Sequence, residues 1–556
     1  MIGAVLAEMM PVSGGVYMNW LGEGFGLLLP IGLSGGAGIC LVCSSFLEHI
    51  RQKEKETAAD CTSGEEYASG SGNEKKLPRA GAELDDGRRL HVFVGLILGI
   101  SVFLTFAAIW PAGKERELIL FHLMDNIPIS FHVDSVGRLF AGVTSVIWLA
   151  AGFYAFLYMK RQGEEKRFFG FYLLVYGILL SLDFAGNLVT MYVFYEFMTL
   201  SAMPLILHNG SKEAIMAALK YLFYSMCGAY CALFGIYFLF QYCDTLTFTA
   251  GGTLNQALAA ENGGILQIAV FLMLIGFGAK AGMFPLHSWL TAAHPAAPAP
   301  ASAVLSAIIV KGGVLAVIRT VYYVAGPDVI RGTWVQTAWM SLTLLTIFMG
   351  SMLAYREKVF KKRLAYSTIS QVSYILFGLS LLDPVGMTGA LLHVVFHAGV
   401  KCALFLTAGI FIFRTGKTRV EEYTGIGKSM PVTLWCYTFA SLALIGIPPF
   451  SGFTSKWYLA QGALQSNTGI FRTAGPVVLL LSALLTAGYL LPVTIKGFLP
   501  GENFVLQERR EPADCRREKP DIMSVSLLML TILTVLIGLW PGPLIQYAAE
   551  IAAAVM

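Results

Sequence analysis

Residues 274–313 read LIGFGAKAGMFPLHSWLTAAHPAAPAPASAVLSAIIVKGG, and this stretch decides the fold. It places Lys280 and Lys311 in otherwise apolar segments. A charged side chain near the centre of a bilayer costs about 2.5–3.5 kcal/mol on insertion scales. Pro285 follows Lys280 closely, and a proline breaks a helix because it has no backbone N–H to donate. A broken membrane helix beside a buried charge is typical of ion sites, so the first hypothesis is ion or proton transport.

The composition predicts an all-α integral membrane protein. The 556 residues are 56% hydrophobic and only 13% charged, with a mean hydropathy of +0.65. Apolar stretches of about 20 residues, long enough to cross a bilayer as a helix, recur along the chain. About 14 transmembrane helices are expected, near residues 24–46, 91–111, 133–159, 168–187, 188–208, 215–241, 265–283, 300–323, 335–354, 365–383, 386–413, 432–457, 473–495 and 522–545.

Basic residues in the loops test this count independently. The loops after odd-numbered spans carry 28 Lys/Arg, and those after even-numbered spans carry 4. Basic loops stay in the cytoplasm, so a multi-pass protein of the cell inner membrane with both termini outside is expected. The net charge of +4 reflects this topology and gives no reason to expect nucleic-acid binding. The remaining seven basic residues fall inside expected spans: Arg138, Lys220, Lys280, Lys311, Arg319, Lys401 and Lys456.

An acidic residue also falls inside an expected span. Glu196 stands near the middle of NLVTMYVFYEFMTLSAMPL, residues 187–205. A direct or water-bridged ion pair with Lys280 would lower the cost of burying both groups. The alternative is a structural ion pair that holds two helices together, but burying an ion pair in lipid is costly in free energy.

Two histidines and a lysine share one helix face in LLHVVFHAGVKCALFL, residues 391–406. His393, His397 and Lys401 are spaced by four residues, which aligns their side chains. A proton relay that includes Lys311 is the favoured interpretation. Zinc is the alternative, but a third ligand is not evident and a neighbouring ammonium would oppose the cation.

A second broken helix is expected at GIPPFSGFTSK, residues 446–456, where Pro448 and Pro449 precede Lys456. Two broken helices, each with a lysine at a corresponding place, predict two inverted five-helix repeats. Repeat one would cover about 168–323 and repeat two about 335–497.

The expected organisation has three parts. Residues 1–131 hold N-terminal helices with a polar cytoplasmic loop at 48–89, and residues 132–500 form the conducting core. Residues 501–556 add a polar linker and the last transmembrane helix. Nothing in the sequence assigns a role to the 48–89 loop.

No cofactor site is evident in the sequence. The nine cysteines are scattered, and neither a G-x-G-x-x-G motif nor a P-loop appears. We therefore expect no cofactor, no metal and no redox centre on this chain.

Five motifs, in order along the chain, carry a family resemblance: FYEFMTLSAMPLIL, KAGMFPLHSWLTAAHPAAPAPASAVLSAIIVKGG, KRLAYSTISQVSYILFG, HVVFHAGVKCALFLTAG and GIPPFSGFTSKW. They resemble the proton-conducting, antiporter-like membrane subunits. That family includes the M, N and L types of complex I (NADH dehydrogenase) membrane-arm subunits, the A and D types of multi-component Na⁺/H⁺ antiporters, and membrane-bound hydrogenase subunits. The resemblance implies fourteen helices and a hydrated polar axis at the membrane midplane.

The resemblance also implies a proton pathway. It makes Glu196 and Lys280 the partners on the fifth and seventh helices, Lys311 the central lysine, and Lys456 the terminal residue. The full set of implied pathway residues is Glu196, Lys280, Lys311, His393, His397, Lys401 and Lys456.

Three functions remain open. The first is a subunit of a redox-driven proton pump, whose partner subunits carry the NADH dehydrogenase or hydrogenase chemistry. The second is a D-like component of a Na⁺/H⁺ antiporter complex without redox chemistry. The third is a membrane enzyme that uses His393 and His397, disfavoured because no nucleophile or carboxylate stands beside them in sequence. The coupling ion, electron donor and acceptor, and partner subunits are not specified by the sequence.

Overall fold

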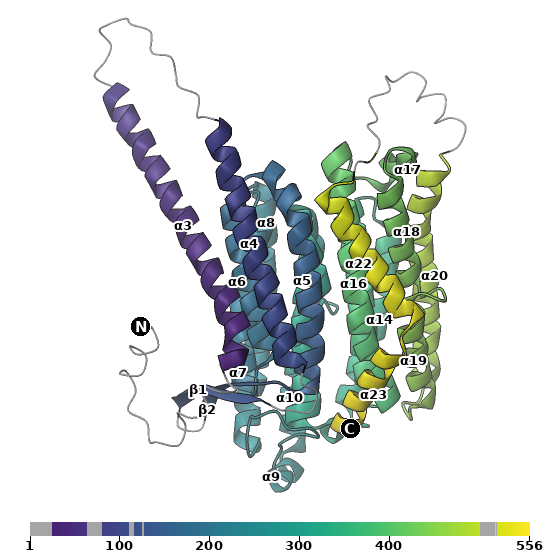
Figure 1. The fold of residues 1–556 in the computed structure, drawn as a ribbon. Coiled ribbons are helices and arrows are strands. Elements are labelled where there is room, and N and C mark those ends of the chain that lie inside the picture. The colour runs from purple at the N-terminus through teal and green to yellow at the C-terminus, as the bar shows by residue number, and fades with distance from the viewer. Residues whose placement is uncertain (1–24, 64–79, 111–115, 125–126, 501–517, 519) are drawn as a thin grey trace, which may run out of the picture.

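Helices fill most of the chain in this computed structural model, which describes residues 25–63, 80–110, 116–124, 127–500, 518 and 520–556 (Figure 1). The helices run roughly side by side between two ends. The strands β1 (Glu117–Met124) and β2 (Ile127–His132), helix α9 (Gln256–Glu261) and the C-terminus lie at one end, here called the hairpin end (Figure 1). Helix α17 (Ile426–Ser429) lies at the opposite end, here called the α17 end.

The N-terminal part differs from expectation in two ways. Helix α3 continues to Ser63 and α4 begins at Ala80, so helices occupy most of the stretch expected as a loop at 48–89; residues 64–79 lie outside the described residues. An antiparallel hairpin, not predicted from the sequence, follows α4. The elements are α3 (Phe25–Ser63), α4 (Ala80–Ile109), β1 (Glu117–Met124), β2 (Ile127–His132) and α5 (Ser135–Gln162).

The first five-helix unit contains one broken helix and one irregular helix. The break at Pro285 separates α10 from α11, as predicted. The last helix of the unit contains two π-helical segments, η2 and η3. The elements are α6 (Glu165–Asp183), α7 (Leu188–Ile206), α8 (Lys212–Tyr242), α9 (Gln256–Glu261), α10 (Gly263–Ala281), α11 (Ser288–Ala296), α12 (Ala299–Val304), η2 (Leu305–Ile309), α13 (Val310–Ile318) and η3 (Arg319–Ala325).

The second unit has the same order of helices in the inverted orientation. Its first helix, α14, starts near the hairpin end, whereas α6 ends there. In each unit the third helix packs against both halves of the broken helix: α8 against α10 and α11, and α16 against α18 and α19. The elements are α14 (Trp334–Arg356), α15 (Phe360–Ser380), α16 (Pro384–Thr415), α18 (Pro431–Ile445), α19 (Ser451–Gln465) and α20 (Phe471–Phe498).

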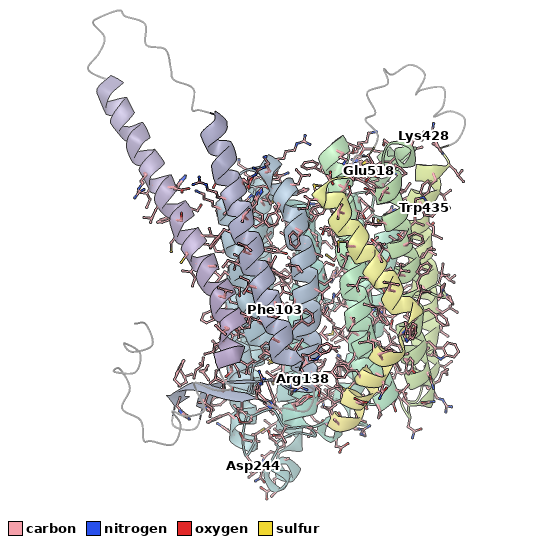
Figure 2. The ribbon with its side chains drawn as sticks, viewed as in Figure 1. Phe103, Arg138, Asp244, Lys428, Trp435 and Glu518 are labelled. Carbon is pink, nitrogen blue, oxygen red and sulfur yellow. The ribbon has the colours of Figure 1, made fainter. Side chains whose placement is uncertain are left out.

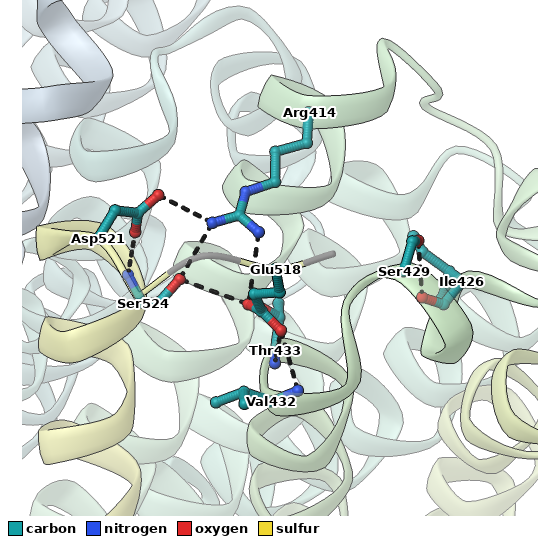
Figure 3. A network of polar contacts seen from close by, with 8 residues as sticks. All are labelled: Arg414, Ile426, Ser429, Val432, Thr433, Glu518, Asp521 and Ser524. Atoms are coloured by element: carbon teal, nitrogen blue, oxygen red, sulfur yellow. Dashed lines mark hydrogen bonds and ion pairs between the residues drawn. The ribbon is translucent and has the colours of Figure 1, made fainter. Parts of the chain in front are cut away.

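A polar network at the α17 end ties the last helices to the second unit (Figure 3). Arg414, near the end of α16, bonds Asp521 at 2.8 Å, and Asp521 caps α22 by accepting from the N–H of Ser524. Glu518 accepts from the N–H groups of Val432 and Thr433 at the start of α18. The remaining short elements are η4 (Pro327–Val329), η5 (Val420–Tyr423), α17 (Ile426–Ser429), α22 (Ile522–Leu539) and α23 (Gly542–Val555).

The surface fits a bilayer. Figure 2 shows Asp244 at the hairpin end, Lys428 and Glu518 at the other end, and the exposed Phe103 and Trp435 on the sides. Eleven helices in the described part of the chain are long and apolar enough to cross a membrane. The three other expected spans correspond to α6, α15 and the broken α18–α19, so the count of fourteen stays a prediction. The protein is a multi-pass integral membrane protein.

The centre of the molecule is the irregular helix. Every residue of 299–327 is buried, because α5 and helices of both five-helix units surround it. Most of α16 is buried as well. These two helices carry half of the ionisable residues singled out in the sequence, namely Lys311, Arg319, His393, His397 and Lys401.

Candidate functional site

Lys280 lies in a cradle of hydroxyl groups. It is fully buried in the last turn of α10, where the helix dipole favours a cation. Its Nζ donates to Tyr221 Oη at 2.7 Å, Thr199 Oγ1 at 2.9 Å and Ser225 Oγ at 3.2 Å. The three hydrogen bonds come from α7 and α8, so they satisfy all three donors of the ammonium group without a carboxylate.

Of the two forms of the ion pair predicted between Glu196 and Lys280, direct or water-bridged, the direct form is absent from the described residues. Among the described residues no carboxylate lies within 4 Å of Lys280 Nζ. Glu196 lies on α7 and its Oε1 is buried without a hydrogen-bond partner. Glu196 is nevertheless close enough for its charge to act on Lys280. Hydroxyl groups of α7 and α8 bind the Lys280 ammonium where a carboxylate was expected. The water-bridged ion pair between Glu196 and Lys280 stays a prediction.

Lys311 joins the two five-helix units. Its Nζ donates to the carbonyl of Ser306 at 2.9 Å and contacts Nδ1 of His397 at 2.5 Å. Ser306 belongs to the π-helical segment η2, and such segments leave the regular hydrogen-bond ladder and occur often at functional sites. His397 is on α16, so one contact connects the irregular helix of the first unit to the second unit.

The two histidines of α16 continue this contact. The His393 and His397 rings are 5.9 Å apart, centroid to centroid. His393 Nδ1 lies 2.9 Å from Ser455 Oγ on α19, one residue before Lys456. In the described residues the Nε2 atom of each histidine is buried without a partner. Each ring therefore has one nitrogen available for a further group or a water.

Lys401 shares the helix face of the histidines, as predicted, but points elsewhere. It bonds the carbonyl of Leu364 at 2.9 Å and the hydroxyl of Ser367, both on α15. Within the described residues it makes no hydrogen bond to His397. Lys401 thus forms a side branch toward α15 and the α17 end, not a step between the histidines and Lys456.

Lys456 lies beyond the second break. Its Nζ donates to the carbonyls of Leu444 at 2.7 Å and Ile445 at 2.9 Å, at the end of α18. Those carbonyls have no partner within their own helix, and the negative end of the helix dipole favours a cation there. Lys280 precedes the break of its helix and Lys456 follows the break of its own. The correspondence of the two lysines stays a prediction.

The sequence did not single out two further buried ionisable residues, His294 and Lys361. His294 is fully buried on α11, stacks on Phe405 at 4.6 Å, and has no hydrogen-bond partner for either ring nitrogen in the described residues. Lys361 is buried and bonds the carbonyl of Ala297 at 2.8 Å. His294 lies within one of the five motifs, but from sequence alone a single histidine cannot be distinguished from a buried residue of the core.

No group of three or more His, Cys, Asp or Glu side chains is placed to hold a metal ion within the described ranges. The absence of a cofactor on the chain stays a prediction.

Known proteins resemble this chain over most of its length. A family model described as NADH:quinone oxidoreductase/Mrp antiporter, transmembrane, matches residues 185–483. NADH-quinone oxidoreductase subunit N of Desulforudis audaxviator is 35% identical over 453 residues, 80% of this chain and 86% of that protein. The D component of the Na⁺/H⁺ antiporter of Alkalihalophilus pseudofirmus is 28% identical over 83% of this chain and 89% of that protein.

A solved structure shares the fold. A chain of the membrane-bound sulfane sulfur reductase, an archaeal respiratory membrane complex, aligns with a TM-score of 0.76 at 21% identity and covers 95% of this chain and 97% of its own. The matched family model includes Glu196, Lys280, Lys311, the α16 residues and Lys456 within its bounds. The chain belongs to the NADH:quinone oxidoreductase/Mrp antiporter family of membrane proteins.

Proposed function

We propose that this chain is a proton-translocating membrane subunit of a multi-subunit complex. The observation that carries the proposal is the contact between Lys311 and His397, which joins the two five-helix units at a fully buried place. A lysine that faces a histidine nitrogen can pass a proton to it, because imidazole accepts at one nitrogen and donates from the other. The proton path runs from Lys280 through Lys311, His397 and His393 to Lys456.

The first step of this path needs water. Lys280 and Lys311 make no direct hydrogen bond to each other in the described residues. Their helices nevertheless approach closely, since a Cβ on Gly313 would lie 3.1 Å from Cβ of Lys280. Glu196 acts on this step through its charge, which favours a proton on Lys280.

The last step leads from His393 to Lys456. Ser455, which contacts His393, directly precedes Lys456 in sequence. Lys456 Nζ is 5.1 Å from the centre of the Tyr374 ring, on which His393 stacks. His393, Tyr374 and Lys456 are thus one cluster formed by α15, α16 and α19. Lys401 offers a connection from the histidines toward the α17 end.

The driver of the transport lies in partner subunits. We assign first a redox-driven complex of the NADH dehydrogenase or hydrogenase type, supported by the 35% identity to an NADH-quinone oxidoreductase subunit. The second candidate is a Na⁺/H⁺ antiporter complex, supported by the resemblance to the D component of such an antiporter. In both, the chain resides in the inner membrane with both termini outside and carries no cofactor of its own.

The test compares K311A and H397A with K417A, an exposed basic residue outside the path. The complex is kept in membrane vesicles, and acidification is followed after addition of NADH, hydrogen or a sodium gradient. Removing a positioned proton-transfer group lowers such rates by about 10²-fold or more. K311A and H397A should lose acidification while K417A keeps it. Full acidification in K311A would refute the path.

The same vesicles separate the two candidate complexes. Acidification supported by NADH or hydrogen identifies a redox pump, and acidification supported only by a sodium gradient identifies an antiporter. Mass spectrometry of the proteins that co-purify with the chain provides an independent answer.

A further inference from the structure

A partly open cavity lies between the N-terminal helices and the second five-helix unit. It is formed mainly by α4, α5, α16, α22 and α23, and its volume is about 320 Å³. That volume is within the range of pockets that hold small molecules. Among the described residues that line it, the polar ones are Arg138, Ser451, Thr534 and Tyr547, and the others are apolar residues or glycine. The proton path proposed above uses none of these four residues.

The cavity has the length of one lipid leaflet. Its wall on α5 runs from Arg138 to Ile147, which at 1.5 Å per residue is about 14 Å along the helix. Half of a hydrocarbon core about 30 Å thick is about 15 Å. Helix α5 begins directly after the hairpin, and Figure 2 shows Arg138 toward the hairpin end. The cavity therefore runs from the hairpin side of the membrane to near its middle.

The positive charge of the wall lies at the hairpin end. Arg138 is the basic residue among the described lining residues, and Tyr547 lies close enough for the charge of Arg138 to act on it. Of the acidic groups nearby, Asp134 is paired with Arg319 and Glu550 is exposed at the surface. A guanidinium group binds phosphate through parallel hydrogen bonds, and basic pockets between membrane helices bind anionic lipid headgroups. The hairpin end of the cavity is thus complementary to a lipid phosphate.

The rest of the cavity suits a hydrocarbon chain. Leu533 of its wall is 37% exposed, and Met529 and Leu536 on the same helix are exposed as well, so the cavity opens onto the apolar side of the protein. Thr534 Oγ1 donates within its own helix at 2.8 Å, and Ser451 Oγ is buried by its neighbours. Water here would find fewer than the two to four polar partners it needs, and an empty space would forfeit dispersion contacts.

The cavity lies behind the face of α16 that carries the two histidines. Val395, Phe396 and Gly399 form its wall on this helix. Val395 is two residues after His393, and Gly399 is two residues after His397, which places each about 200° round the helix from its histidine. A molecule in the cavity therefore packs α16 against α5 without entering the proton path.

We propose that this cavity binds one acyl chain of an anionic phospholipid from the leaflet at the hairpin end. The lipid phosphate binds the Arg138 guanidinium, and the chain runs along α5 to the middle of the bilayer. The bound lipid fills the space between the N-terminal helices and the second unit. The proposal goes beyond the proposed function and stands without it, because no proton transfer is involved.

The experiment counts lipids that stay bound to the intact complex. The complex is reconstituted in nanodiscs of phosphatidylcholine with a minor share of phosphatidylglycerol, and native mass spectrometry identifies the lipids that its subunits retain. R138Q removes the guanidinium, and R138K keeps a positive charge. G142F fills the cavity, since a Cβ on Gly142 would meet only Ile109 Cδ1 within 4 Å, at 3.6 Å. The matched controls are R472Q, in an exposed residue at the hairpin end, and G99F on α4, where a Cβ would meet nothing within 4 Å.

We expect the unchanged chain, R472Q and G99F to retain one phosphatidylglycerol each. Retention should fall about tenfold or more in R138Q, fall less in R138K, and be lost in G142F. A phosphatidylglycerol with a photoreactive group at the end of its chain should label α5 or α16 in the unchanged complex.

Each contrary result overturns a stated part of the proposal. Equal retention in R138Q and R472Q, or equal retention of phosphatidylcholine and phosphatidylglycerol, overturns the anionic headgroup at Arg138. Equal retention in G142F and G99F overturns the cavity as the site, and a retained isoprenoid quinone in place of phospholipid overturns the choice of ligand. If R138Q and G142F fail to assemble, the photoreactive lipid decides on the unchanged complex: labelling that avoids both α5 and α16 overturns the proposal.

Discussion

At the scale of single residues, three of the buried lysines, Lys280, Lys401 and Lys456, are held by neutral oxygen atoms. Lys280 bonds hydroxyls, Lys456 bonds helix-end carbonyls, and Lys401 bonds a carbonyl and a hydroxyl. A carboxylate partner would hold each proton firmly, and removing the proton would leave an unpaired buried charge. Hydroxyls and carbonyls stabilise the ammonium form less strongly, so these lysines are suited to give up a proton and take it back.

Glu196 tests the remaining electrostatic coupling. We expect E196Q to lower proton transport about tenfold or more, because the change removes a negative charge that favours a proton on Lys280. Assembly should be normal, since no hydrogen bond to Glu196 Oε1 is lost. Vesicle acidification is the measurement, with E213Q in the exposed first turn of α8 as control. Equal transport in both variants would exclude a coupling role.

His208 predicts a pH dependence of stability. It follows α7, its Nε2 lies 3.2 Å from the Gly163 carbonyl, and burial together with nearby Arg167 lowers its pKa from 6.5 to about 4. Between these two values the unfolded chain binds more protons than the folded chain, so stability falls as the pH is lowered. Thermal unfolding of the purified protein between pH 7 and pH 4 should show this slope. H208Q should flatten it, and an identical slope in H208Q would contradict the assignment.

At the scale of elements, Gly446 controls the second break. Its φ of +87° ends α18, and a Cβ there would lie 3.0 Å from Cδ of Lys456. G446A should therefore strain the backbone and displace Lys456, with loss of transport. Gly469 also has positive φ, but its Cβ would meet nothing within 4 Å. G469A should lower the free energy of unfolding by a similar amount, about 1 kcal/mol, and leave transport intact. Equal transport in G446A and G469A would contradict the prediction.

The breaks were predictable and the π-helical segments were not. Pro285 and Pro448 predict the breaks, because proline has no backbone N–H to donate to the hydrogen bonds of a helix. No proline or glycine lies within η2, so its irregularity comes from packing against its neighbours. The β-hairpin was not predicted, because its strands are short and partly apolar and their composition does not differ clearly from that of the neighbouring helices.

The sequence could predict which candidate residues lie near one another only where they share a helix; whether they form the functional site stays a prediction. Helical spacing placed His393, His397 and Lys401 on one face, because that spacing depends on one helix only. The partner of Lys280 depends on three helices, and side chains such as Tyr221 gave no sign of their role in sequence. Lys311 facing His397 likewise requires two distant segments to meet.

At the scale of the whole molecule, the proposed path needs a source of energy, which the proposed function places in a partner subunit or in an opposing ion gradient. We expect the purified chain in liposomes to oxidise neither NADH nor hydrogen, and to show at most a passive leak of protons or sodium. Assays of both oxidations on the isolated chain check this. Tightly bound flavin or iron in the isolated chain would overturn the prediction.

The complete burial of residues 299–327 has a consequence for biosynthesis. When this segment leaves the ribosome, the helices of the second unit that cover it have not yet been made. It must therefore enter the bilayer before His397, which contacts Lys311, has been made, whereas Asp134, the ion-pair partner of Arg319, already exists. A charged Lys311 without its partner costs about 2.5–3.5 kcal/mol. The apolar residues around Lys311 in sequence make that insertion feasible, and α15 and α16 then cover the segment. The newborn first half is an unfinished intermediate until translation has passed Thr415.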